Sequence, residues 1–352
     1  MKDLSLDRAT FGPLGFGSAV LGNLYAPISD TAARDTAREA IELGFQYFDT
    51  APHYGFGLSE TRLGAALHEL DPRQELIVST KAGRKLVPRS GVQPGQQRQG
   101  FVSAEPFESE FDYTYDSVMR TYEDSLHRLQ RERIDILYVH DIGRFAHGDN
   151  HPRRFKEFMD GGYRAMHELR AAGAVGAIGI GVNEWEVCVE ALGFADFDVV
   201  MLAGRYTLLE QLSLEIFLPL CAKRGVRVIV AGPYNSGILA TGAGPATGGG
   251  LPTGVGKSGV AHYNYSAAGP EIIARVAAIE AICASHNVPL PAAALQFPLA
   301  HPQVLCVVAG FGSSVEVTKA DDYLRRPIPP SLWSDLRTAG LLRTDAPVPI
   351  MF

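Results

Sequence analysis

The chain has 352 residues, of which 46% are hydrophobic and 20% charged, and its formal net charge is −7. This composition is that of a globular protein with a large core, and the acidic balance argues against a nucleic-acid-binding surface, which is usually basic. No stretch approaches the roughly 20 apolar residues that a membrane-spanning helix requires, and we expect no signal peptide. Four scattered cysteines without a Cys-x-x-Cys pair indicate reduced thiols, so we expect a cytoplasmic protein.

Short apolar runs typical of strands alternate along the chain with longer amphipathic runs typical of helices. The expected strands cover residues 14–19, 45–49, 75–81, 134–140, 176–183, 197–202, 226–231 and 304–309. The expected helices cover residues 30–43, 59–70, 115–131, 155–171, a segment from 184 onward, 214–224, 270–286 and a last helix beginning within 310–314. A long polar loop, residues 82–112, follows the third strand, and a Gly-rich insertion, residues 236–269, follows the seventh.

About eight strand–helix units, with near-continuously apolar strands, predict a parallel sheet that is buried on both faces. The pattern favours a single (β/α)8 TIM-type barrel over residues 1–352, with long loops after strands 3 and 7. A doubly wound sheet is the alternative, but its glycine fingerprint is incomplete, because Val20 follows Gly15 and Gly17 at the position of the third glycine.

Polar residues stand at the carboxyl ends of four consecutive expected strands: Asp49, Lys81, His140 and Asn183. Tyr54 lies in the turn that follows the first of them. In a (β/α)8 barrel, the carboxyl ends of the strands meet at one rim, where active sites are built. Each residue alone has an ordinary structural explanation, but their joint placement predicts one pocket.

These residue types suit proton transfer at a carbonyl or alcohol oxygen. A free tyrosine has a pKa of about 10, and the ammonium of Lys81 would lower the pKa of Tyr54 toward that of a useful acid or base. Asp49 would keep Lys81 charged and oriented, and His140 would orient the substrate oxygen. We therefore expect proton transfer coupled to hydride transfer by a nicotinamide cofactor.

Three segments resemble the aldo-keto reductase family: residues 48–55 with the following helix start, residues 79–81 and residues 138–140. The resemblance covers nearly the whole chain. It implies a barrel that binds NAD(P) and a catalytic tetrad of Asp49, Tyr54, Lys81 and His140. It also implies that Asn183 holds the nicotinamide carboxamide.

The chain departs from the family at three cofactor positions. Val182 stands before Asn183 where the family commonly has a serine. Ala203 stands where the family has a glutamine, and Ala231 stands where it has the aromatic residue that stacks on the nicotinamide. Tyr234, three residues further on, is expected to take over the stacking. Trp185 and Tyr206, near strand ends, are expected to form walls of the substrate pocket.

The segment around the start of the last expected helix is expected to contact the cofactor through Gly310, Gly312, Ser313, Ser314 and Glu316. The resemblance places Gly312 where NADPH-dependent relatives carry a basic residue. A carboxylate at Glu316 would repel a 2′-phosphate and could accept hydrogen bonds from a 2′-hydroxyl, so we expect NAD to be preferred over NADP. The ordinary alternative is a serine-capped helix with an acid in its first turn.

Residues 203–211, together with residues 181–185, further resemble a branch of the family that holds aldose 1-dehydrogenases, L-galactose dehydrogenases and pyridoxal 4-dehydrogenases. This resemblance implies NAD-dependent oxidation of a cyclic hemiacetal, such as L-fucose or L-galactose at C1, to a lactone, with Tyr54 as the general acid/base. The alternatives are oxidation of pyridoxal to pyridoxolactone, NADPH-dependent carbonyl reduction, and a non-catalytic cofactor-binding subunit. We expect a monomer or small homo-oligomer that acts on a small molecule, without a metal, nucleic-acid or membrane partner.

Overall fold

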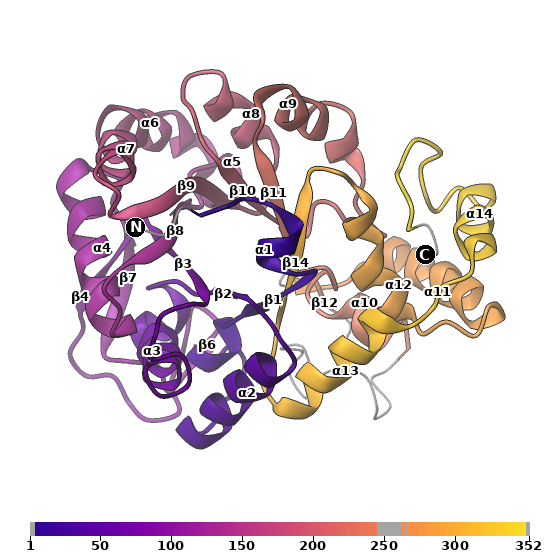
Figure 1. Ribbon diagram of the computed structural model, residues 1–352, viewed down its shortest axis with the longest axis horizontal. Helices are drawn as coiled ribbons and strands as arrows, with labels where there is room; N and C mark the ends of the chain where they lie inside the picture. The colour runs from indigo at the N-terminus through magenta and orange to yellow at the C-terminus, as the bar shows by residue number, and fades with distance from the viewer. Residues whose placement is uncertain (1–3, 245–261, 265, 350–352) are drawn as a thin grey trace.

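A computed structural model gives the fold and describes residues 4–244, 262–264 and 266–349. Eight parallel strands close into a barrel that the helices surround (Figure 1). Around the barrel, the strands follow the order β1-β14-β11-β10-β9-β8-β3-β2. Their bounds are β1 Leu14–Gly17, β2 Tyr47–Asp49, β3 Ile77–Ala82, β8 Ile134–His140, β9 Val175–Val182, β10 Val199–Ala203, β11 Arg227–Ala231 and β14 Val304–Gly310. The expected (β/α)8 barrel is confirmed, and each strand ends within two residues of its expected bounds.

The helices of the described residues mostly follow the barrel strands, as expected for a (β/α)8 chain. Their bounds are α1 Arg8–Phe11, α2 Asp30–Glu42, α3 Leu58–Leu70, α4 Tyr115–Leu129, α5 Arg144–His147, α6 His151–Glu157, α7 Tyr163–Ala171, α8 Glu186–Leu192, α9 Phe217–Arg224, α10 Ile238–Thr241, α11 Pro270–Ser285, α12 Leu290–Gln296, α13 Ser314–Arg325 and α14 Pro330–Thr338. No helix among the described residues is both long and apolar enough to cross a bilayer.

Three expectations about the helices were wrong. The helix expected over 155–171 is two helices, α6 and α7, joined by a π-helical turn at Phe158–Gly162. The helix α12 was not expected at all. The helix that begins at Ser314 is not the last, because Pro330 starts α14; proline is favoured at a first helical position, where its missing N–H costs no hydrogen bond.

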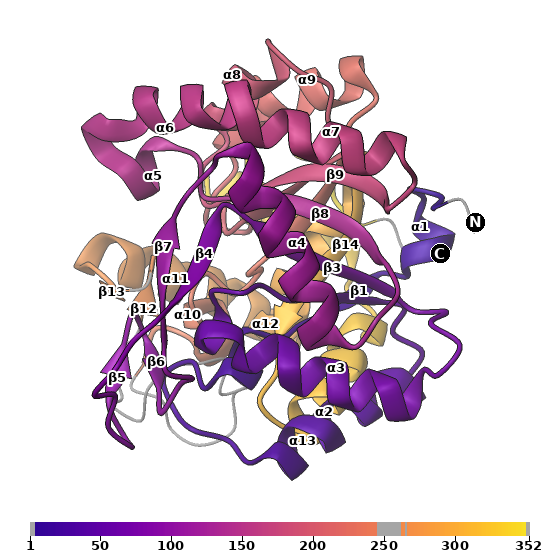
Figure 2. The same cartoon turned by 90° about the vertical axis from the view of Figure 1, so that its left-hand side faces the viewer.

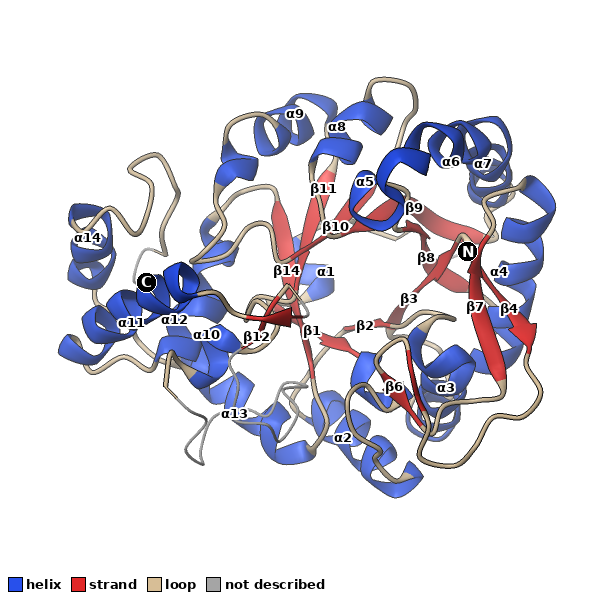
Figure 3. Cartoon of the chain, turned by 180° about the vertical axis from the view of Figure 1, so that it is seen from behind, coloured by secondary structure: helices blue, strands red, loops and turns tan. Residues whose placement is uncertain are grey.

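The polar loop expected over residues 82–112 is folded into two antiparallel ribbons. One pairs β4 (Arg84–Pro88) with β7 (Phe107–Phe111), and the other pairs β5 (Gln97–Arg98) with β6 (Phe101–Val102). After the seventh barrel strand, β12 (His262–Tyr263) pairs with β13 (Ser266–Ala267), while part of the Gly-rich insertion lies outside the described residues. Figure 2 shows that these ribbons project from the end of the barrel opposite to α1, and Figure 3 shows the chain from behind.

Two hydrophobic layers hold the barrel together. The outer layer lies between the strands and the surrounding helices. The inner layer fills the barrel, and Phe11 of α1 packs on Tyr47 within it, with the ring centres 5.2 Å apart. Gly15 makes room for Tyr47, because a Cβ at residue 15 would lie 2.7 Å from the Tyr47 ring. The inner layer therefore blocks one end of the barrel and leaves the other end for a site.

Candidate active site

Asp49 and Lys81 form a buried ion pair at the carboxyl ends of β2 and β3. Strand register places Asp49 beside Ser79, so Lys81, two residues further along, points to the same side of the sheet. Nζ of Lys81 lies 2.6 Å from Oδ2 of Asp49 and 2.8 Å from the carbonyl oxygen of Thr50. The side chain of Lys81 passes beside Gly181 of β9, where a Cβ would be in ordinary contact with its Cε at 3.6 Å.

Charge and burial act against each other in this pair. Burial lowers the pKa of Lys81, but the charge of Asp49 and the neighbouring Tyr54 raise it more, so the pKa of Lys81 lies above its ordinary value. Burial also raises the pKa of Asp49, and the ammonium opposes that shift. Lys81 therefore stays protonated at neutral pH and is available as a fixed positive charge beside Tyr54.

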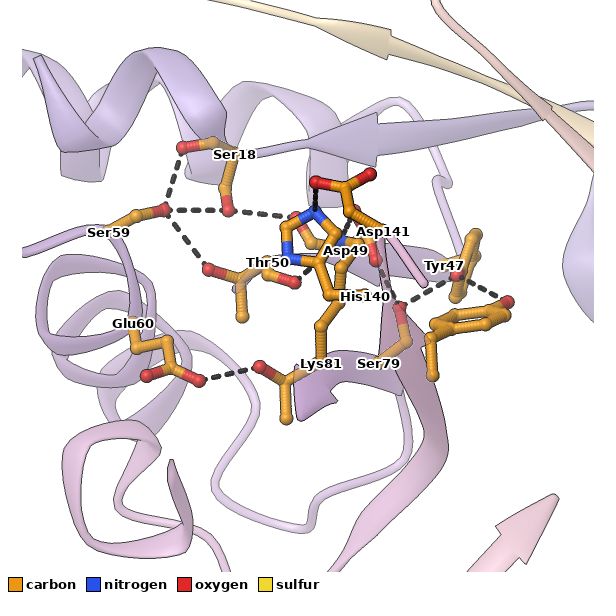
Figure 4. A network of polar contacts seen from close by, with 12 residues as sticks. Ser18, Tyr47, Asp49, Thr50, Ser59, Glu60, Ser79, Lys81, His140 and Asp141 are labelled. Carbon is orange, nitrogen blue, oxygen red and sulfur yellow. Dashed lines mark hydrogen bonds and ion pairs between the residues drawn. The ribbon is translucent and has the colours of Figure 1, made fainter. Parts of the chain in front are cut away.

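A chain of hydroxyl groups inside the barrel anchors Asp49 (Figure 4). Ser79 Oγ donates to Oδ1 of Asp49 over 2.7 Å, and the hydroxyl of Tyr47 lies 2.7 Å from the same Oγ. Because the single proton of Ser79 is used on the carboxylate, Tyr47 donates to Ser79. Tyr138 lies next in the chain, 3.2 Å from the Tyr47 hydroxyl. The carboxylate is thus held by Lys81 on one side and by the barrel interior on the other.

Tyr54 is held over Lys81 by a tight turn. Its ring centre lies 4.8 Å from Nζ of Lys81, and its ring is 6.1 Å from that of His140. Burial raises the pKa of Tyr54 above its ordinary value, and the charge of Lys81 offsets this shift only in part, so the expected net lowering is not seen. The ammonium therefore favours the phenolate form of Tyr54, as a proton-transfer role requires.

The turn after Tyr54 depends on left-handed backbone. Gly55, Phe56 and Gly57 all have positive φ angles, which glycine adopts at little cost and phenylalanine rarely adopts. The backbone of Gly55 also lies directly on that of Gly22, and a Cβ at residue 22 would be 2.6 Å from the carbonyl carbon of Tyr54. This backbone contact fixes the position of the tyrosine.

His140 lies beside Tyr54 in a form that carries no charge. Its pKa is well below the ordinary value because of burial and the nearby charges of Arg84 and Lys81. Nε2 lies 3.4 Å from Oδ2 of Asp141, and Nδ1 is buried without a hydrogen-bond partner. A proton on Nε2 faces the carboxylate, whereas a proton on Nδ1 would be a buried unsatisfied donor, so the Nε2–H tautomer is favoured.

The structure thus brings the four predicted catalytic residues together around one point at the carboxyl end of the barrel. The neighbouring motif residues Ser59 and Glu60 have a supporting position. Ser59 bridges Ser18 and Thr50 (Figure 4). The fully buried Glu60 pairs with Arg128 over 2.6 Å and accepts from Thr80. These contacts tie α3 to β1, β3 and α4 below the site.

A cleft beside the tetrad contains some of the predicted cofactor residues. Asn183, Tyr234 and Gly310 line it, together with residues that the sequence did not single out. The latter include Ala19, Val20, Leu24, Tyr25, Arg205, Asn235 and Asn264. Arg205 donates to Asn264 over 2.9 Å, so the loops after the sixth and seventh barrel strands meet at the cleft.

The remaining predicted cofactor residues lie at the start of α13, outside the lining of this cleft. Ser313 caps the helix and accepts from the backbone N–H of Glu316, and Gly312 N donates to Oε2 of Glu316 over 2.8 Å. Burial raises the pKa of Glu316 to about 7. The carboxylate therefore occupies the N-terminal end of the helix itself, as a capping residue does.

The predicted pocket role of Tyr206 was wrong. Tyr206 is fully buried between the barrel and its helices, where its ring packs on Phe297 at 5.3 Å and on His301 at 5.5 Å. Trp185 is half-buried and packs on the outer hydrophobic layer. Neither residue lines the cleft, because both rings find apolar partners on the outside of the barrel.

The sequence did not point to Asp141, and it named Arg84 only as one of several loop residues that could contact substrate, without its ion pair. Asp141 directly follows His140 at the end of β8, and Arg84 of β4 forms an ion pair with it. Asp141 carries the same signal as the tetrad residues, because it is polar and stands at the carboxyl end of a strand. It did not stand out because His140, directly before it, is the residue predicted to be functional on that strand. The partner Arg84 could not be found from sequence, because the pairing joins segments 57 residues apart.

Residues 13–339 match the model of the Aldo/keto reductase family. The chain belongs to this family. It is 41% identical to pyridoxal 4-dehydrogenase of Microbacterium luteolum, with 95% of each chain covered, and 38% identical to D-threo-aldose 1-dehydrogenase of a Pseudomonas species, with 94% of each chain covered. The solved aldo-keto reductase AKR11C1 of Bacillus halodurans, in its holo form, superposes with a TM-score of 0.68 at 27% identity, over 95% of this chain and 93% of that one.

Membership of the aldo-keto reductase family makes the chain an NAD(P)-dependent oxidoreductase of class EC 1.1.1. The residues around the cleft fit a nicotinamide cofactor. Asn183 supplies an amide beside the tetrad, Val20 and Ala309 supply apolar surface, and Gly310 leaves backbone open to close approach. Arg205 adds a guanidinium that donates to the carbonyl oxygen of Gly204 and to Oδ1 of Asn264.

Proposed function

We propose that the protein oxidises a cyclic hemiacetal, most simply an aldose at C1, to a lactone with NAD as the hydride acceptor. The observation that carries this proposal is the position of Tyr54 over Lys81, with the ammonium charge maintained by Asp49. This arrangement removes a proton from a hydroxyl group at the moment when the carbon that bears it loses hydride. A bound nicotinamide supplies the hydride acceptor.

The protein's own residues perform the proton transfer. Tyr54 accepts the proton of the anomeric hydroxyl, because the positive charge of Lys81 stabilises the phenolate. The 3.4 Å contact between Nε2 of His140 and Asp141 is long for a hydrogen bond, so the Nε2–H of the uncharged ring can donate to the substrate oxygen instead and orient it. Asn183 and Tyr234 line the same cleft, where Asn183 would hold the carboxamide of the cofactor and Tyr234 would stack on its ring.

We also propose that NAD is preferred over NADP. Glu316 is 4% exposed at the start of α13, and above pH 7 its carboxylate is largely ionised. A negative charge there repels a 2′-phosphate, and the backbone N–H of Gly312, which could otherwise bind that phosphate, is already occupied.

Oxidation of pyridoxal is the second candidate. Its support is the 41% identity to a pyridoxal 4-dehydrogenase, slightly above the 38% to an aldose dehydrogenase. Pyridoxal forms an internal cyclic hemiacetal, so it presents the same reacting group as an aldose. The same proton transfer at Tyr54 would yield pyridoxolactone.

Absorbance of the reduced nicotinamide tests both candidates. The purified protein is mixed with NAD or NADP and with L-fucose, L-galactose, D-arabinose or pyridoxal, and NADH or NADPH formation is followed. The proposal expects NADH formation with at least one hemiacetal, lactone as the product, and weaker rates with NADP. Formation of product only in the reductive direction with NADPH would instead establish a carbonyl reductase, and no turnover in either direction would favour a binding subunit.

A further inference from the structure

Asp141 has a strained and firmly held position beside the tetrad. Its φ is 54°, in the left-handed region that few residues other than glycine, asparagine and aspartate adopt. Its backbone N–H donates to Gly181 over 3.0 Å, and its carbonyl accepts from the hydroxyl of Tyr113 over 2.9 Å. Strain that the surrounding structure enforces in this way is common at functional sites.

The carboxylate of Asp141 faces the groups that surround the reacting oxygen. Oδ2 pairs with Nη2 of Arg84 and lies 3.4 Å from Nε2 of His140. Oδ1 makes a long contact of 3.5 Å with Nδ2 of Asn183. A carboxylate can accept about four hydrogen bonds, so Asp141 keeps acceptor capacity on the side of the pocket. Its side chain is 10% exposed, and that of His140 is 9% exposed, so both reach the opening.

Arg84 clamps this carboxylate from the ribbon that follows the third barrel strand. It stacks on Phe111 at 4.2 Å and lies 3.5 Å from both ring nitrogens of His53. Its side chain is 14% exposed. A guanidinium has five N–H donors in a fixed fork, so one contact with the carboxylate leaves donors for a ligand.

The charges around Tyr54 cancel. Lys81 is paired with Asp49, Arg84 is paired with Asp141, and His140 is uncharged. A substrate that carries a carboxylate or phosphate next to its reacting carbon would meet Asp141 without a free compensating charge. Paired charges with spare donors and acceptors instead suit neutral hydroxyl groups.

We propose that Asp141 and Arg84 form the subsite for the hydroxyl group adjacent to the reacting carbon, and so select neutral, hydroxyl-bearing hemiacetals. This inference rests on the proposed function and names its substrate determinant. The oxygen that His140 binds lies about 3 Å from Nε2, and a neighbouring hydroxyl lies about 3 Å further, within reach of Oδ2 of Asp141. Asp141 accepts the hydrogen bond of that hydroxyl, and Arg84 donates to its oxygen.

The test compares a substrate with and without this hydroxyl. Values of kcat/KM are measured with NAD for L-fucose and 2-deoxy-L-fucose, in the wild type and in Asp141→Asn. The wild type should prefer L-fucose by about 10- to 100-fold, the value of one hydrogen bond to a charged group. Asp141→Asn should lose most of its activity on L-fucose and little on the 2-deoxy sugar, so that the preference falls below about threefold. Equal losses on both sugars would mean that Asp141 only positions His140, and would overturn the proposal.

Two further variants separate recognition from folding. Lys85→Gln is the matched control, because Lys85 is the sequence neighbour of Arg84 and pairs with Asp112 at 2.9 Å, away from the tetrad. This variant should leave kcat/KM for both sugars unchanged. Arg84→Lys keeps the charge but not the planar fork, and should lower the preference without lowering the melting temperature. A preference unchanged in Arg84→Lys and in Asp141→Asn would contradict the subsite.

A second measurement judges the subsite if no aldose is oxidised. In that case the proposed function fails for sugars, and binding to the NADH complex is measured by protein fluorescence with pyridoxal and 3-deoxypyridoxal. The two compounds differ only in the phenolic hydroxyl of pyridoxal, which is one bond further from the reacting carbon than the 2-hydroxyl of an aldose but still lies next to the reacting oxygen. Tighter binding of pyridoxal to the wild type, but not to Asp141→Asn, supports the subsite. Equal binding of both compounds to the wild type overturns it.

Discussion

Nζ of Lys81 and Oδ2 of Asp49 are 2.6 Å apart, and the two side chains are only 3% and 5% exposed. Neither charge can be removed alone without leaving the other charge buried and unpaired. This ion pair is therefore a requirement for the stability of the barrel mouth as well as for the charge beside Tyr54.

Replacing Asp49 by asparagine should lower the free energy of unfolding by about 3 kcal/mol at neutral pH, because it leaves the Lys81 ammonium without its partner. The pKa of Lys81 is raised in the folded state, so this stabilisation is complete below the ordinary pKa of 10.5 and is lost as the pH rises through the higher folded-state value. Urea unfolding at pH 7 measures the loss. Asp112→Asn, in a half-exposed ion pair with Lys85, should cost less than about 1 kcal/mol, and a similar loss in both variants would contradict the interpretation.

Tyr54→Phe should reduce turnover by at least about 10²-fold, the usual size of a general acid–base contribution, while cofactor affinity is retained. The ring remains in place over Lys81, so the folded structure should not change. Steady-state kinetics gives the turnover, and quenching of protein fluorescence by NADH gives the affinity. Turnover within tenfold of the wild type would exclude Tyr54 as the proton acceptor.

Glu316→Gln should weaken the discrimination against NADP and remove the part of its pH dependence that comes from the carboxylate. The pKa of Glu316 is about 7, so the carboxylate gains its charge between pH 6 and pH 8, and the preference for NAD should increase over this range in the wild type. The ratio of kcat/KM for NAD and NADP is measured at both pH values. The 2′-phosphate also titrates near pH 6, and the glutamine variant reports that contribution alone. The same pH dependence in both proteins would show that Glu316 does not sense the phosphate.

Gly22→Ala should lower activity by at least tenfold, because the added Cβ would lie 2.6 Å from the backbone of Tyr54 and must displace it. Gly269→Ala is the matched control, since nothing lies within 4 Å of a Cβ at that position and its φ is not positive. Circular dichroism and thermal unfolding establish whether both variants fold. Full activity in a folded Gly22→Ala protein would mean that the turn can shift without moving the phenol.

The sequence by itself determined the barrel and the location of its site. Parallel strands buried on both faces must be apolar along their length, so the eight strands could be recognised within two residues of their true bounds. The carboxyl ends of parallel barrel strands meet at one rim, and this is why Asp49, Lys81 and His140 could be predicted from their positions alone to lie close together.

Only the tertiary structure decided which loop residues face the site and which are buried elsewhere. Tyr206 also follows a strand, but it lies in a loop, where distant partners such as Phe297 determine the direction of the ring. Likewise, Arg84 meets Asp141 because β4 and β7 form a ribbon that no single-strand pattern revealed. Strand periodicity fixes side-chain direction locally, whereas in loops the direction is decided by packing between segments that are far apart in the chain.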